Sequence, residues 1–128
     1  MISKLGNKII ISVRTSFNVG KSYPMDGFFL FDYHITIENK SENIVQLLKR
    51  QWFIYDSVGE RSEVEGEGVV GLQPMLLPNE KFTYQSACHL KSDVGKMHGK
   101  YLMQQIDSAQ LFEVDIPTFK FIANYRRN

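Results

Sequence analysis

Large apolar residues alternate with polar ones along most of this chain, and this period of two restricts the possible fold more than any other feature. The clearest stretch is residues 28–39, where every second residue from Phe29 to Ile37 is aromatic or β-branched. Residues 9–17 and 81–90 repeat the pattern. Such alternation is typical of strands that bury one face, and β-branched and aromatic side chains favour strands. The pattern predicts an all-β fold.

The alternating segments give seven or eight strands. The expected strands are residues 9–17, 28–39, 45–56, 61–67, 81–90, 99–107, 110–116 and 119–125. Turn residues separate them at intervals of about 8–12 residues, which is the pattern of an antiparallel β-sandwich. Trp52, the only tryptophan, is expected in the core on the same face as Leu48 and Ile54.

Length and charge exclude several classes of protein. A chain of 128 residues has the size of one domain with one core, so a single domain over residues 1–128 is expected. The 15 Lys and Arg residues nearly balance the 14 Asp and Glu residues, which leaves no net field to attract nucleic acid or a membrane. Early charged and hydroxyl residues interrupt the N-terminal apolar run, and no run is long enough to span a bilayer. The lone Cys88 excludes an internal disulfide. A cytoplasmic protein is expected.

A GxGxxG string at Gly66, Gly68 and Gly71 is the motif that most suggests ligand chemistry. In dinucleotide-binding folds this string opens a helix, but Pro74 and a second proline follow it here and exclude a regular helix. The GK[ST] sequence of a P-loop is also missing. Two interpretations stay open. Either the amides of these glycines and of Val69 form an anion-binding nest, or the glycines serve bulges and turn positions with positive φ.

Arg50 is the charged residue that stands out. Alternation places it between Leu48 and Trp52 on the apolar face of its strand. A guanidinium in that position reaches solvent, pairs with a carboxylate or stacks on an aromatic ring. The Arg50 side chain equally suits an anion anchor beside the turn that contains Gly66, Gly68 and Gly71, which we call the glycine turn. Lys49 would be a second base there.

Metal binding and catalysis find less support in the residues. Glu63, Glu65 and Glu67 share one strand face and offer oxygen ligands to Mg²⁺, but neighbours on one face lie about 7 Å apart. A solvated charged face is therefore favoured. Cys88 and the three histidines lack the spacing of a zinc site. No nucleophile motif and no suitably spaced acid and base appear, so a protein without a cofactor and without enzymatic activity is expected.

Several motifs together closely resemble the ApaG family. They are Arg50-x-Trp52, residues 56–59, GEGVVGLQPMLLPNEKFTYQS at 66–86, GKMHGKYLM at 95–103 and IPTF at 116–119. The resemblance covers nearly the whole chain. Asn79 stands where the family usually has glycine after the proline, and Asn tolerates a similar turn geometry.

The resemblance implies an immunoglobulin-like or fibronectin type III-like β-sandwich, which agrees with the strand count. It implies no established catalytic activity. The family is associated with cobalt and magnesium homeostasis, and its glycine motif with pyrophosphate binding. Similar domains are modules of larger eukaryotic proteins, which suggests interaction rather than chemistry.

Three functions remain. The favoured one is a non-enzymatic module that binds another protein or a second copy of itself, through a sheet face or the loops near the glycine turn. It predicts an exposed apolar patch or a homodimer interface. The second is a binder of phosphate-bearing small molecules that uses the amides of Gly66, Gly68, Val69 and Gly71 with Arg50. The third is a magnesium-dependent phosphoanhydride hydrolase, which needs converging carboxylates.

Overall fold

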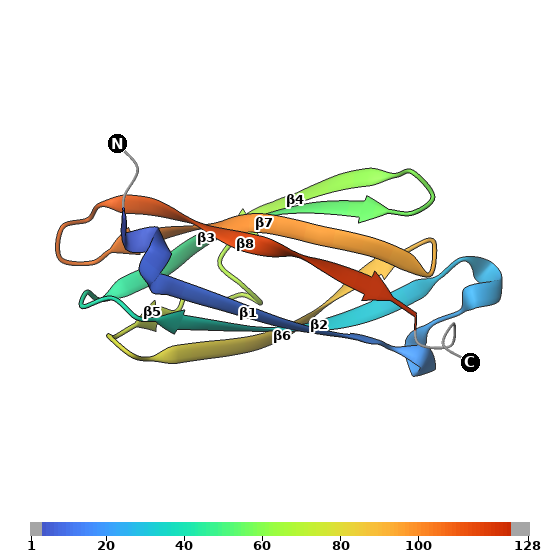
Figure 1. Cartoon of the computed structure of the whole chain (residues 1–128), viewed down its shortest axis with the longest axis horizontal. Helices are drawn as coiled ribbons and strands as arrows, with labels where there is room; N and C mark the ends of the chain where they lie inside the picture. The colour runs from blue at the N-terminus through green and yellow to red at the C-terminus, as the bar shows by residue number, and fades with distance from the viewer. Residues whose placement is uncertain (1–3, 124–128) are drawn as a thin grey trace.

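Two antiparallel sheets stack into a β-sandwich in the computed structural model, which describes residues 4–123 (Figure 1). The first sheet has the order β1 (Ile9–Phe17), β2 (Phe29–Asn39) and β6 (Lys81–Leu90). The second has the order β4 (Arg61–Glu67), β3 (Val45–Asp56), β7 (Val94–Gln105) and β8 (Leu111–Ile122), and the short β5 (Met75–Leu76) pairs with the start of β3. The predicted all-β sandwich is confirmed.

Short 3₁₀ turns are the only helical elements in the described residues. They are η1 (Lys4–Lys8), η2 (Val19–Lys21) and η3 (Pro24–Asp26). Over residues 4–123 the chain therefore forms no helix with the length and apolar content needed to cross a membrane.

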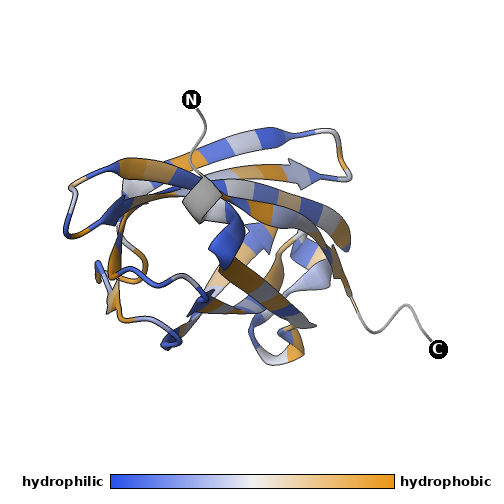
Figure 2. Ribbon diagram, turned by 60° about the vertical axis from the view of Figure 1, so that its left-hand side comes forward, coloured by the Kyte–Doolittle hydropathy of each residue, from blue (hydrophilic) through white to orange (hydrophobic). Residues whose placement is uncertain are grey.

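The core lies between the two sheets. In β2 every second residue from Phe29 is buried, as the alternation predicts, and Figure 2 shows hydrophilic and hydrophobic bands alternating along the strands. Trp52 is also buried, as predicted, and its ring centroid lies 5.8 Å from those of Tyr33 and Phe119. Burying a large apolar side chain stabilises the fold by about 1.5–3 kcal/mol, so this aromatic cluster is a main source of stability.

The prediction that Leu48 shares the core face with Trp52 is wrong. The pairing of β3 with β7 shifts register between Leu47 and Lys49, which marks a β-bulge. Leu47 is consequently fully buried, whereas Leu48 is partly exposed. An extra residue at a bulge reverses the faces of the residues that follow it, and simple alternation does not reveal where this happens.

The predicted strands 110–116 and 119–125 are in fact one strand, β8. The register of β7 against β8 shifts between Met97 and Gly99, so Pro117 lies in a bulge on an edge strand. A proline there removes no ladder hydrogen bond. The predicted end at Tyr125 lies outside the described residues. Strand β7 also begins at Val94, before the predicted start at Gly99.

The two long sides of the sandwich differ. On one side β1 lies along β8, and the Thr15 hydroxyl donates to the Lys120 carbonyl at 3.2 Å. On the other side β6 and β4 are the outermost strands of their sheets. This second side, which we call the open side, is bordered by the glycine turn after β4.

Candidate functional site

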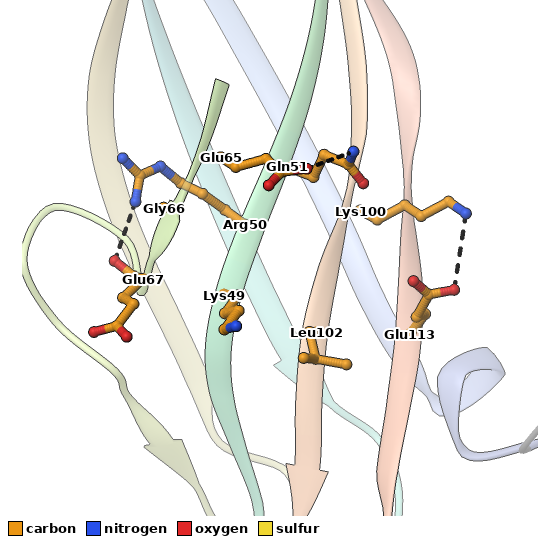
Figure 3. Close-up of a pocket in the computed structure, with 9 residues that line it drawn as sticks. All are labelled: Lys49, Arg50, Gln51, Glu65, Gly66, Glu67, Lys100, Leu102 and Glu113. Carbon is orange, nitrogen blue, oxygen red and sulfur yellow. Dashed lines mark hydrogen bonds and ion pairs between the residues drawn. The ribbon is translucent and has the colours of Figure 1, made fainter. Parts of the chain in front are cut away.

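A hollow of about 360 Å³ lies beside the glycine turn on the outer face of the five-stranded sheet (Figure 3). Strands β3, β4, β7 and β8 supply its walls. The lining residues are Lys49, Arg50, Gln51, Glu65, Gly66, Glu67, Lys100, Leu102 and Glu113. Because strand neighbours on one face repeat every second residue, the paired strands bring most of these side chains together. Arg50 is the exception, because it alternates with Lys49 and Gln51 along β3.

Charges of both signs line this hollow. Lys100 pairs with Glu113 at 3.8 Å, and the Gln51 amide donates to the Glu65 carboxylate at 3.0 Å. An exposed ion pair such as Lys100–Glu113 contributes little to stability. The mixture suits contact with a polar surface better than capture of one strongly charged ligand.

Arg50 is tied to the backbone of the glycine turn. Its Nη1 donates to the carbonyls of Glu67 at 3.1 Å and Gly68 at 3.0 Å. A Cβ at Gly66 would lie 2.7 Å from that Nη1, which is too close, so glycine makes room for the guanidinium. Within the described residues no carboxylate forms an ion pair with Arg50.

Residues 69–72 form a two-residue hairpin turn. Val69 donates to the Leu72 carbonyl at 2.8 Å, and Leu72 donates back to the Val69 carbonyl at 2.9 Å. The central residues Val70 and Gly71 have φ of 44° and 79°, which matches a type I′ turn. Gly68 also has positive φ, and a Cβ there would meet the Leu72 carbonyl oxygen at 2.1 Å. Two of the three glycines thus occupy positive-φ positions, as the turn interpretation predicts.

Most backbone N–H groups of this turn already donate hydrogen bonds within the protein. Gly68 donates to the Leu48 carbonyl at 2.8 Å, Val69 donates to Leu72, and Gly66 lies opposite Arg50 in the β3–β4 ladder. A phosphate would have to replace some of these hydrogen bonds. The role of Gly66, Gly68, Val69, Gly71 and Arg50 in ligand binding stays a prediction.

The glutamates of β4 lie exposed along the strand. Glu63, Glu65 and Glu67 face Phe53, Gln51 and Lys49 across the ladder. Among residues 4–123, no three His, Cys, Asp or Glu side chains come together in a group that could hold a metal ion.

A cleft of about 300 Å³ on the open side was not apparent from the sequence. Its walls come from both sheets. The lining residues are Tyr33, Arg50, Trp52, Ile54, Val64, Ser86, Ala87, Cys88, His89 and Met97. Arg50 lines both this cleft and the hollow of Figure 3. The only signal in the sequence was the position of Arg50 on an apolar face, because the walls of the cleft come from strands that are far apart along the chain.

Burial changes the acidity of several groups around the cleft. It raises the pKa of Tyr33, Tyr84 and Tyr101, against a smaller opposing effect of the Arg50 charge. The Tyr84 and Tyr101 hydroxyls lie 2.5 Å apart. Burial also raises the pKa of the Cys88 thiol to about 11, so this side chain is a neutral thiol near pH 7.

The segment that runs from the glycine turn through β5 exposes apolar side chains. Val70, Leu72 and Met75 are each 53% exposed, and Leu77 is 48% exposed. We call residues 70–77 the apolar loop.

Comparison with known proteins identifies similar chains. The model of a family described as the ApaG domain matches residues 20–105. Protein ApaG of Bdellovibrio bacteriovorus is 40% identical over 113 residues, which are 88% of each chain. Protein ApaG of Parvibaculum lavamentivorans is 42% identical over 119 residues, 93% of this chain and 91% of its own. A crystal structure of a protein designated ApaA from Bordetella pertussis superposes with a TM-score of 0.87 and 34% identity, covering 91% of this chain and 94% of the other.

Proposed function

The chain belongs to the ApaG domain family, and from this premise we propose that it is a non-enzymatic module that binds another protein. The observation that carries the proposal is the apolar loop. Single exposed apolar residues are normal on protein surfaces. Four such side chains within eight residues, each about half exposed, are typical of a surface that a partner covers.

The backbone of the loop supports the same proposal. Val70 has φ of 44°, which β-branched residues rarely adopt. Strain of this kind costs about 1–3 kcal/mol and is concentrated at functional positions. A valine kept here, with its side chain 53% exposed, fits a residue whose contact with a partner offsets the strain.

Three further features belong to this proposal. The division of strands into the orders 1-2-6 and 4-3-7-8 supports an immunoglobulin-like or fibronectin type III-like framework. The single buried thiol, Cys88, suits a reducing compartment, and we place the function in the cytoplasm. We propose that any link to cobalt or magnesium homeostasis runs through the partner, because the β4 glutamates are exposed and spread along the strand.

The test compares partner binding by two surface variants. Affinity capture identifies the bound protein, and calorimetry with the purified partner then gives Kd for the wild type and for Leu72→Asp/Met75→Asp. Placing two carboxylates in an apolar contact should weaken binding at least tenfold, about 1.4 kcal/mol or more. Sedimentation equilibrium applies the same comparison to self-association.

Val19→Asp/Met25→Asp is the matched control. These side chains are 72% and 99% exposed and belong to the β1–β2 connection, at the end of the sandwich away from β5 (Figure 1). The control should bind like the wild type. The proposal is wrong if the folded apolar-loop variant also binds every partner, including a second copy, with wild-type affinity.

A further inference from the structure

Strand β6 has a neighbour on one side only. It pairs with β2, and the described residues place no strand along its other edge. Asn39 donates to the Glu80 carbonyl at 3.0 Å, which makes this pair a hydrogen-bonded one. Since hydrogen-bonded pairs alternate along an antiparallel ladder, residues 81, 83, 85, 87 and 89 direct their N–H and C=O groups away from β2. All five residues are exposed.

This free edge borders the cleft of the open side. Residues 86–89 of β6 form one wall, and Arg50, Trp52 and Ile54 of β3 contribute to the opposite wall. A smaller cavity of about 100 Å³ also contains Ile54 and His89 and continues toward Lys91. The two cavities therefore form a groove that follows the β6 edge.

Arg50 gives the larger cavity a positive charge, and no carboxylate of the described residues lines that cavity. The smaller cavity holds Asp56 and Glu60, but Asp56 accepts from the Lys91 amide and the Ser92 hydroxyl, and Glu60 pairs with the Lys91 side chain at 2.9 Å. The two hydrogen bonds of Arg50 both use Nη1 and both go to backbone carbonyls. A guanidinium carries five N–H donors in a planar fork that fits a carboxylate. Trp52, Ile54 and Val64 supply apolar walls beside it. The groove thus offers an apolar lining for a side-chain stem and a cation for its end.

We propose that the β6 edge and Arg50 together bind an extended acidic peptide of a partner protein. The peptide backbone adds a strand by pairing with the free N–H and C=O groups of residues 81–89, as in recognition by strand addition. Alternate peptide side chains then face the cleft, and a Glu or Asp among them bonds the Arg50 guanidinium. This site goes beyond the proposed function, because it uses a surface other than the apolar loop.

The probe is a displayed library of random eight-residue peptides, selected on the wild-type chain. Selected peptides are synthesised, and their Kd is measured by fluorescence anisotropy. We expect the selected sequences to share an acidic residue with β-branched or aromatic residues two positions away. Replacing that acidic residue by its amide should weaken binding at least tenfold, and amide NMR shifts should concentrate at residues 81–89.

Two protein variants test the two halves of the site. Arg50→Lys keeps the charge but loses the planar fork, and it should weaken binding at least tenfold. Ala87→Pro removes an N–H that points to the free edge and not to β2, so the fold should persist while peptide binding falls at least tenfold. Leu72→Asp/Met75→Asp should leave peptide affinity unchanged, which separates this site from the apolar loop.

Several results would overturn the proposal. These are a library that yields no binder, selected peptides without a shared acidic residue, or binding that survives both Arg50→Lys and Ala87→Pro. Sedimentation equilibrium tests whether a second copy of the chain occupies the β6 edge instead of a peptide. If the wild type is a dimer that Ala87→Pro dissociates, the edge is covered by a second copy of the chain and the peptide site is rejected.

Discussion

At the scale of single residues, Arg50 and Gly66 depend on each other. The guanidinium occupies the space in which any larger residue at position 66 would place its Cβ, and it holds the carbonyls of Glu67 and Gly68. The first glycine of the GxGxxG string is therefore explained by a contact within the protein. The effect of changing either residue should depend on the other.

Gly66→Ala should lower the free energy of unfolding by about 1 kcal/mol. The displaced guanidinium loses two hydrogen bonds worth about 0.5–1.5 kcal/mol each, and the replacement of glycine by alanine in a strand offsets about 0.5–1 kcal/mol of that loss. In an Arg50→Ala background the same change should cost less than half as much. Urea unfolding of the four proteins measures the coupling. Gly20→Ala is the control, since a Cβ there has ordinary contacts. Equal costs of Gly66→Ala in both backgrounds would show that the two residues act independently.

Cys88 should react slowly in the folded protein. Its pKa of about 11 leaves roughly 0.1% thiolate at pH 8, whereas an unfolded cysteine has about a quarter in that form. Alkylation by iodoacetamide at pH 8 should therefore be at least 100-fold slower in the native protein than in urea. The native rate should rise with pH toward 11. A native rate within tenfold of the unfolded one would contradict the burial of this thiol.

At the scale of elements, the glycine turn combines backbone strain at Val70 with the exposure of its apolar side chain. A type I′ turn favours Asn-Gly at its two central positions, and this chain has Val70-Gly71 instead. Val70→Asn should raise the free energy of unfolding by about 1 kcal/mol, since Asn tolerates positive φ. Partner binding through the apolar loop should weaken at the same time. Urea unfolding and calorimetry measure the two effects, and a variant no more stable than the wild type would argue against strain at position 70.

Asp56 connects the two sheets at the far end of the open side. Its carboxylate, at the end of β3, accepts hydrogen bonds from the Lys91 amide at 2.6 Å and from the Ser92 hydroxyl in the β6–β7 connection. Partial burial opposes the charged form, but these bonds outweigh it and lower the pKa of Asp56 below its ordinary value of 3.8. Because the pKa is lower in the folded state, the stabilisation is present above about pH 4 and is lost as pH falls through the folded value.

Asp56→Asn should therefore lower the free energy of unfolding by about 1 kcal/mol at pH 7, a value reduced for partial exposure. The difference from the wild type should shrink below about pH 4. Urea unfolding from pH 3 to 8 provides the measurement. Asp115→Asn, on an exposed position of β8, is the matched control for the loss of a carboxylate. A difference for Asp56→Asn that stays constant across this range would rule out a contribution from its charge.

Element boundaries show what alternation can and cannot predict. The bounds of β1, β3, β4 and β6 agree with the sequence pattern, because each follows a regular period between turn residues. The pattern fails at Leu48 and Pro117, where bulges depend on the pairing with β7. The glycine turn was visible as a motif, whereas the cleft of the open side was not. The shape of a surface formed by two sheets depends on how the sheets pack together, which no local sequence pattern predicts.

At the scale of the whole molecule, any ligand of the folded state must raise its stability. This linkage tests the cation and phosphate hypotheses together. We expect 1 mM Mg²⁺, Co²⁺ or pyrophosphate to change Tm by less than about 1 °C. The glutamates Glu63, Glu65 and Glu67 lie exposed along β4. The backbone N–H groups of Gly68 and Val69 already donate hydrogen bonds within the protein. A ligand with Kd of about 10 μM would add about 2.7 kcal/mol and raise Tm on the order of 10 °C. A rise with pyrophosphate that disappears in Arg50→Ala would instead assign the turn to phosphate binding, and a rise with either cation alone would place a metal on the chain itself.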